Sequence, residues 1–125
     1  MDEERLIRIA RETLKPMDLG NGFSSGGVGA AMEGESGRIY TGVCFDLACG
    51  LGFCAEVAAV AEMLKSGESR ILQVVAVDWD GSVLPPCGRC RETMMQVNPG
   101  NHGTVVLLPE GRHATLAELL PNYWL

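Results

Sequence analysis

Ile71–Val77 reads ILQVVAV, a nearly continuous apolar run. A run of this kind is typical of a strand that is covered on both faces, as at the centre of a sheet with helices on either side. A second apolar segment, Thr104–Leu108, predicts another buried strand. Helical patterns lie before and between these strands, over Phe53–Leu64 and Cys87–Val97. Alternating strands and helices of this length predict an α/β fold.

The preceding segments extend this pattern toward the start of the chain. Asp2–Lys15 reads as an amphipathic helix, which Pro16 ends. Val28–Met32 and Arg38–Cys44 are rich in β-forming residues and predict an antiparallel hairpin. The glycine- and serine-rich stretch Gly20–Gly27 predicts a loop, which either connects flexibly or borders a pocket.

The last predicted helix covers Thr115–Leu120, where Thr115 and Glu118 form a capping box at its start. The order of elements is therefore α-β-β-α-β-α-β-α. We expect a single domain spanning residues 1–125, built as a three-layer α/β/α sandwich around a mixed, roughly five-stranded sheet.

Composition and charge restrict the partners that this chain can have. The formal net charge is −6, and Lys and Arg do not gather into a basic stripe. We expect no nucleic acid polymer as partner, because such binding depends on clustered cations that neutralise phosphates. A small neutral or cationic ligand fits this balance better. The acidic start Met1-Asp2-Glu3-Glu4 and the lack of an apolar run of about 18 residues favour a cytoplasmic protein with no membrane partner.

Three of the five cysteines stand where they can hold one metal ion. Cys54 lies at the start of one predicted helix, and Cys87 and Cys90 lie in the first turn of another. There the helix dipole and the free N–H groups stabilise thiolates. Three thiolates can bind zinc and leave its fourth position open, which is the arrangement of catalytic rather than structural sites.

Glu56 lies two residues after the first of these thiols, where its carboxylate can reach a water molecule at the open position without binding the metal. There it can move protons between water, a ring nitrogen and a leaving amine. Alone, such a carboxylate would usually only complement the helix dipole. The Pro-Cys-x-x-Cys motif downstream favours the catalytic role. Arg89 and Arg91 either donate to the sulfurs and offset their charge, or are solvated on the helix surface.

A competing interpretation is a closed site of four thiolates that only stabilises the fold. Cys49 or Cys44 would supply the fourth sulfur. Against this, the chain has a single Cys-x-x-Cys unit, whereas structural zinc ribbons usually have two. Cys44 and Cys49 are most simply small buried apolar residues.

The cysteine and glutamate motifs together resemble those of the cytidine deaminase family, in particular its short nucleoside deaminases with three cysteine ligands. The resemblance extends over nearly the whole chain. Further similar segments are Val28–Ala31, Arg38–Val43, Pro86–Glu92 and the ending from Leu119 to Trp124. The last two of these segments are especially similar to the blasticidin S deaminases.

The resemblance implies one zinc ion per subunit, with the three cysteines named above as ligands and Glu56 as the proton carrier. It also implies that the backbone N–H of Ala55 donates to the carbonyl of the pyrimidine. Members of this branch are typically homotetramers, with a homodimer as the alternative here. Neighbouring subunits complete each pocket, and the C-terminal Trp124, which follows Tyr123, would contribute to such a pocket.

On the sugar side the chain departs from the family pattern. Cytidine deaminases usually carry Asn-x-Glu after the second strand, where these side chains hold the ribose hydroxyls. Here the same positions read Cys44-Phe45-Asp46, and a thiol is only a weak hydrogen-bond donor. The family's aromatic residue in the first loop is displaced, with Gly26 at its usual place and Phe23 three residues earlier. We expect Cys44, Asp46 and Phe23 to contact the substrate.

The expected function is hydrolytic deamination of a free cytosine nucleoside, or of an analogue such as blasticidin S, to the uracil form with release of ammonia. One alternative keeps this chemistry on another aminated heterocycle, such as a modified cytosine or an isocytosine. The other alternative is a non-catalytic zinc protein of deaminase descent.

Overall fold

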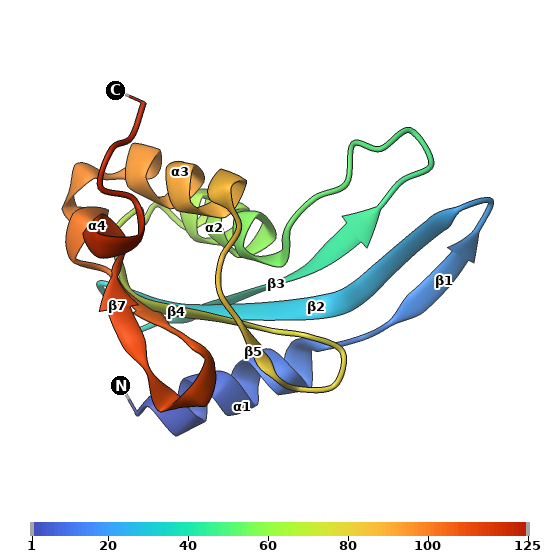
Figure 1. Ribbon diagram of the computed structural model, residues 1–125, viewed down its shortest axis with the longest axis horizontal. Helices are drawn as coiled ribbons and strands as arrows, with labels where there is room; N and C mark the ends of the chain where they lie inside the picture. Colours follow the sequence, from blue (N-terminus) through green and yellow to red (C-terminus); the bar gives the residue numbers. More distant parts are fainter. Residues whose placement is uncertain (1, 125) are drawn as a thin grey trace.

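A single sheet forms the middle layer of the molecule, which is a computed structural model describing residues 2–124. Helix α1 (Glu3–Thr13) lies against one face of the sheet (Figure 1). Helices α2 (Ala55–Lys65), α3 (Gly88–Val97) and α4 (Leu116–Leu119) lie on the other side. The three-layer α/β arrangement is therefore confirmed. Within residues 2–124, no helix is both long and apolar enough to cross a membrane.

The sheet is mixed, and its strands number seven in the described part of the chain. They are β1 (Met17–Gly20), β2 (Phe23–Gly34), β3 (Ile39–Asp46), β4 (Ile71–Val77), β5 (Val83–Leu84), β6 (Val105–Leu107) and β7 (His113–Thr115). The long strand β2 pairs antiparallel with β1, β3 and β4, and β4 pairs parallel with β6. The short strands β5 and β7 pair antiparallel with β4 and β6. Neither of these strands was expected, because a strand of two or three residues is too short to show an alternation of apolar and polar residues.

The glycine-rich stretch 20–27 is mostly strand, so its prediction as a loop is wrong. Strands β1 and β2 form a hairpin whose turn, Gly20–Gly22, has positive φ throughout. Gly26 has a φ of 78° and lies where the pairing of β2 with β3 shifts register. Glycine adopts this backbone without strain and allows the chain to bulge, while the neighbouring residues stay in the ladder. The hairpin and the end of β3 extend beyond the helices as an arm (Figure 1).

Successive residues of the central strands β2 and β4 point to opposite faces of the sheet. Met32 and Val74 pack in one buried cluster with side chains of α2 and α3. Ala31 and Val75 pack in a second buried cluster with side chains of α1. Strand β4 is therefore covered on both faces, as its apolar run predicts.

The two helices that carry the candidate site begin slightly later than predicted. Cys54 is the N-cap of α2 and Cys87 is the N-cap of α3, both with extended backbone. The predicted helices elsewhere differ from the structure by at most a turn at their ends. The capping box between Thr115 and Glu118 is confirmed, with both reciprocal hydrogen bonds present. Both N-caps place a thiol beside the free N–H groups of a helix start.

Close packing of α2 on β3 depends on the absence of a side chain at Gly42. A Cβ there would lie 2.5 Å from the Ala55 carbonyl oxygen and 2.5 Å from the Ala59 nitrogen. We expect Gly42→Ala to lower the free energy of unfolding by about 1–3 kcal/mol in a urea titration, because the helix must move. Gly27→Ala is the control, since a Cβ at Gly27 meets nothing within 4 Å. Equal losses of stability in the two variants would contradict this account.

Candidate active site

Three thiols from two helix starts converge on the side of the sheet that α2 and α3 cover. The Sγ atom of Cys87 lies 3.4 Å from that of Cys54 and 3.4 Å from that of Cys90. All three sulfurs lie within 4.8 Å of one another. The structure therefore brings together the three thiols that the sequence singled out as metal ligands.

The three thiols differ in their surroundings and so in their pKa values. Burial raises the pKa of Cys54, and the neighbouring Cys87 adds to this. Burial and the nearby Glu56 carboxylate raise the pKa of Cys90. Burial alone would raise the pKa of Cys87 too. Hydrogen bonds from the Cys90 backbone and from the two other thiols outweigh burial, so the pKa of Cys87 is lowered. A metal cation among the three sulfurs would favour their thiolate forms.

The donor set and its spacing fit a metal ion that prefers sulfur. Two thiolates on a tetrahedral zinc ion are about 3.8 Å apart, given Zn–S bonds of about 2.3 Å. Two of the sulfur separations here are 3.4 Å, close to that value, and the third is at most 4.8 Å. Thiolates also favour zinc over magnesium or calcium, which prefer oxygen. The three cysteines would thus hold one such ion with a position left for another ligand.

In residues 2–124 the metal-binding cluster contains no fourth sulfur. Cys49 is exposed in the loop after β3, so its prediction as a buried residue is wrong. The loop projects away from the core and gives the side chain nothing to pack under. Cys44 is partly buried, and its Sγ accepts a hydrogen bond from the Val28 N–H at 3.3 Å. The arrangement therefore speaks against a closed site of four thiolates.

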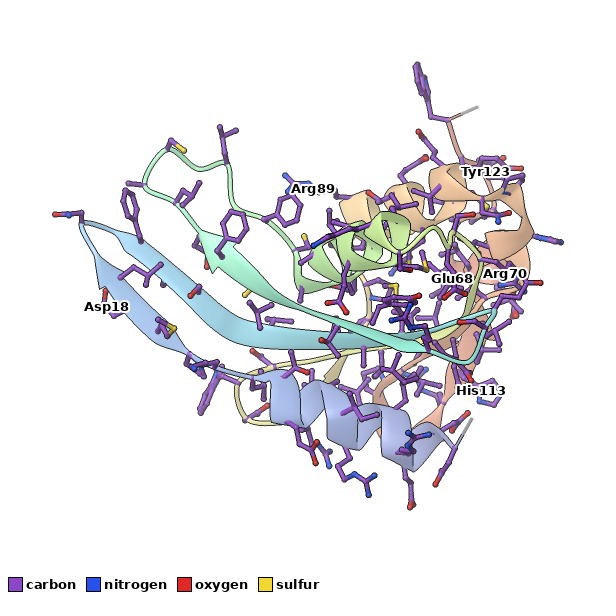
Figure 2. The ribbon with its side chains drawn as sticks, turned by 180° about the vertical axis from the view of Figure 1, so that it is seen from behind. Asp18, Glu68, Arg70, Arg89, His113 and Tyr123 are labelled. Atoms are coloured by element: carbon purple, nitrogen blue, oxygen red, sulfur yellow. The ribbon has the colours of Figure 1, made fainter. Side chains whose placement is uncertain are left out.

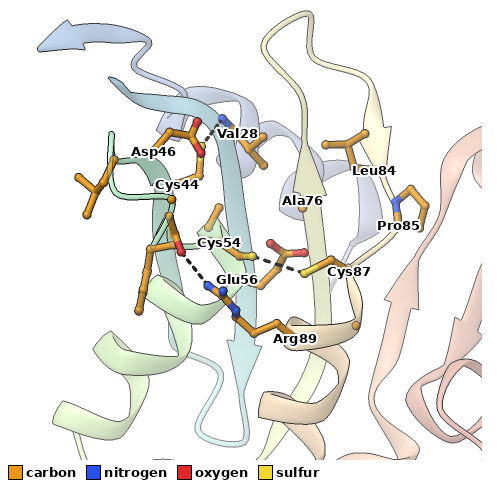
Figure 3. A pocket seen from close by; sticks show the side chains of 16 residues that line it. Val28, Cys44, Asp46, Cys54, Glu56, Ala76, Leu84, Pro85, Cys87 and Arg89 are labelled. Atoms are coloured by element: carbon orange, nitrogen blue, oxygen red, sulfur yellow. Dashed lines mark hydrogen bonds between the residues drawn. The ribbon is translucent and has the colours of Figure 1, made fainter. Parts of the chain in front are cut away.

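Glu56 lies in the first turn of α2, and its carboxylate lies beside Cys54 and Cys87 (Figure 3). The residue is only 6% exposed. Burial raises the pKa of its carboxyl group, while its own backbone N–H and the Cys90 thiol act in the opposite direction. A buried carboxyl group is suited to hold a proton and pass it on, because burial disfavours its charged form.

Cys54, Cys87 and Glu56 line a cavity of about 560 Å³. This volume suits one small ligand. Part of the remaining wall is apolar, formed by Val28, Phe53, Ala76, Leu84 and Pro85. Phe53 is held by Phe45, with the two rings stacked at 5.1 Å between centroids. The cavity therefore combines apolar side chains with the polar groups of the thiols and Glu56.

The apolar wall residues were missed from the sequence. Phe53 directly precedes Cys54, and Pro85 lies two residues before Cys87. Their closeness along the chain to metal ligands was the available signal. Leu84 belongs to the short strand β5, which gave no readable pattern.

In the structure Arg89 and Arg91 donate hydrogen bonds to backbone carbonyls, whereas the sequence suggested the sulfurs as their acceptors. Arg89 Nη1 donates to the Gly52 carbonyl at 2.7 Å (Figure 3). Arg91 donates to the Pro86 carbonyl at 2.9 Å and to the Leu119 carbonyl at 2.9 Å. The planar guanidinium groups of these arginines reach carbonyls that lie just before Cys54 and Cys87. The two arginines thus fix the segments that carry the metal ligands.

The predicted substrate-binding residues are only partly brought together. Ala55, Cys44 and Asp46 line the cavity, and Ala55 is the first residue of α2, where N–H groups have no partner within the helix. Phe23 lines an adjoining cavity instead. Trp124 is 83% exposed, and its backbone N–H donates to Glu92 on α3. Its neighbour Tyr123 lies at the opposite end of the molecule from the arm (Figure 2).

A hydrolase whose site places a cluster of three thiols, able to hold a metal ion, beside a buried carboxylate is the class of protein that this fold and site define. No protein-family model matches the chain. A cytidine deaminase of Mycobacterium tuberculosis is 39% identical over 103 residues, which cover 80% of this chain and 74% of that protein.

Solved structures give the same relationship. A crystal structure of cytidine deaminase from Mycobacterium tuberculosis matches with a TM-score of 0.83 at 31% identity, covering 99% of this chain and 98% of that one. The enzyme from Mycobacterium leprae matches with a TM-score of 0.81 at 30% identity, covering 98% of this chain and 99% of that one. This chain belongs to the cytidine deaminase family.

Proposed function

We propose that this protein is a zinc-dependent hydrolase that converts a free cytosine nucleoside, such as cytidine or deoxycytidine, to its uracil form and ammonia. One observation carries the proposal. Three thiols converge beside a buried carboxylate, and Cys54, Cys87 and Glu56 line a cavity of nucleoside size. The family relationship and the donor set both support zinc as the metal.

The residues of the chain divide the chemistry between them. Cys54, Cys87 and Cys90 would hold the zinc ion, which supplies Lewis acidity that makes a water molecule nucleophilic at neutral pH. Glu56 takes a proton from the attacking water and delivers it to the ring nitrogen beside the carbon that carries the amine. It then passes the second proton of the water to the amine, which leaves as ammonia while the oxygen remains as the new carbonyl. The free N–H of Ala55 donates to the carbonyl of the base.

The cavity walls hold the base for this reaction. A planar ring fits against Phe53, Leu84 and Pro85, which exclude water from the reacting carbon. Cys44 offers its sulfur to the Val28 N–H and has only a weak S–H donor left for a sugar hydroxyl. Asp46 is the carboxylate that can accept from a hydroxyl on this side.

A substrate panel tests the proposal directly. The zinc-loaded protein is incubated with cytidine, deoxycytidine, blasticidin S, 5-methylcytosine and isocytosine, and ammonia release is measured. Turnover of the nucleosides or of blasticidin S supports the proposal. Turnover of the free bases alone would favour the alternative, the same chemistry on another aminated heterocycle. No ammonia from any compound would contradict an enzymatic role.

Arg89 is expected to slow the loss of zinc by tying the loop before Cys54 to the start of α3. We expect Arg89→Ala to speed zinc transfer to a coloured chelator by about 10-fold. The transfer rate of Arg89→Lys should lie between those of the wild type and Arg89→Ala. Arg112→Ala is the matched control, since Arg112 donates to a carbonyl of its own turn, that of Pro109. Equal transfer rates in the Arg89→Ala and Arg112→Ala proteins would refute the role.

We also propose a homotetramer, with a homodimer as the alternative, in the cytoplasm. An indole that is 83% exposed at Trp124 is typical of a residue that is covered by a partner. Free thiols at all five cysteines suit a reducing compartment. Light scattering of the zinc-loaded protein gives the number of subunits, and a monomeric mass would contradict the assembly.

A further inference from the structure

Two phenylalanines close the loop between β3 and α2 where it meets the candidate site. The backbone N–H of Phe45 donates to the Phe53 carbonyl at 3.0 Å, and the Phe53 N–H donates to the Phe45 carbonyl at 2.8 Å. Their rings stack with 5.1 Å between centroids and 3° between planes. The two ends of the loop are therefore fixed to each other, while residues 48–51 between them are exposed.

The two phenylalanines differ in their relation to the catalytic cavity. Phe53 lines the cavity, and the next residue along the chain is the thiol Cys54. Phe45 does not line it, although its neighbours Cys44 and Asp46 on either side do. Phe45 thus contacts a wall of the cavity without being part of that wall.

The stack supplies an order that burial alone does not give to Phe53. Both phenylalanines are only partly buried, so the core does not surround either ring. Ring pairs with centroids about 4.5–7 Å apart attract each other in defined orientations. A side chain that is already ordered loses less conformational freedom when a ligand packs on it, which makes binding tighter. The stack therefore prepares the Phe53 ring for a ligand.

We propose that Phe45 is a positioning residue, which acts through Phe53 to hold the wall against which the base of the substrate packs. The inference rests on the proposed function and assigns to it a residue outside the cavity. Glu56, Cys87 and Cys90 are held by α2 and α3 rather than by this loop. The ring pair therefore acts on substrate binding and leaves the chemical step unchanged.

Steady-state kinetics of the zinc-loaded Phe45→Ala protein with cytidine test this role. We expect KM to rise by about 10-fold and kcat to stay within about two-fold of the wild type, since binding is weakened and the reacting groups are kept. Phe45→Tyr keeps a flat ring and should restore most of the KM. Phe45→Leu, which is apolar but has no flat face, should raise KM as Phe45→Ala does, and it carries the test if Phe45→Ala does not fold.

Leu51→Ala is the matched control, because Leu51 lies in the same loop, is 74% exposed and does not line the cavity. Its KM and kcat should equal those of the wild type. Zinc content is measured on every sample and should stay near one ion per chain.

The outcomes separate this inference from the function on which it rests. If the Phe45 variants deaminate cytidine with the wild-type KM, the deaminase function stands and the positioning role is wrong. The role is also wrong if Phe45→Leu and Phe45→Tyr raise KM equally, or if kcat and zinc content fall while KM is unchanged. If the wild-type protein releases no ammonia from cytidine although zinc is bound, the proposed function fails and the positioning role with it.

Discussion

Glu56→Gln is expected to reduce the deamination rate by about three orders of magnitude while one zinc ion per chain is retained. The amide keeps the shape of the buried side chain but cannot accept a proton from water or deliver one to the amine, and general acid–base catalysis contributes about 10²–10⁴-fold. Because Glu56 is not one of the three clustered thiols, the metal content should not fall. Turnover of cytidine and zinc content by elemental analysis are measured on the same sample.

The control for this variant is Glu62→Gln, a carboxylate on the exposed face of the same helix. It should deaminate at the wild-type rate. A Glu56→Gln protein that keeps even a tenth of the wild-type rate would show that another group carries the protons.

Cys87→Ala is expected to lower the zinc content from about one ion per chain to near zero and to abolish activity. The Cys87 sulfur lies within 3.4 Å of both other thiols, so its loss leaves two donors, too few for a tetrahedral site. The side chain is exposed, which keeps the packing cost of its removal small. The melting temperature should also fall in the presence of zinc, because binding to the native state no longer stabilises it.

Cys49→Ser provides the matched control, as Cys49 is an exposed thiol outside the cluster. It should keep one zinc ion and full activity. Loss of zinc from this protein would instead indicate the closed site of four thiolates, and would contradict the open catalytic site.

Much of the layered fold could be predicted because its signals are local. The apolar run Ile71–Val77 is buried on both faces and agrees with β4 residue for residue. The arm could not be predicted in this way. Its glycines looked like loop residues, yet Gly20 and Gly22 form a tight turn and Gly26 forms a bulge within paired strands. Glycine content alone does not distinguish a loop from a bulged hairpin.

In the candidate site, too, some features could be predicted from the sequence and others could not. Cys-x-x-Cys and Cys-x-Glu have fixed spacing at helix starts, so their convergence could be expected from the sequence. The roles of Arg89 and Arg91 could not, because their acceptors are carbonyls at Gly52 and Leu119, far along the chain. The adjoining cavity was equally hidden, since Asp18 and Asp78 line it together only because the arm folds beside the turn after β4.

Mass spectrometry of the product formed in heavy-oxygen water tests the central claim most directly. The zinc-loaded protein is given cytidine, and the released ammonia and the nucleoside product are measured together. Hydrolysis by the site around Glu56 predicts one ammonia per uridine, with the heavy oxygen in the new carbonyl group. An unlabelled product, or no product from a protein that holds its zinc, would contradict hydrolytic deamination at this site.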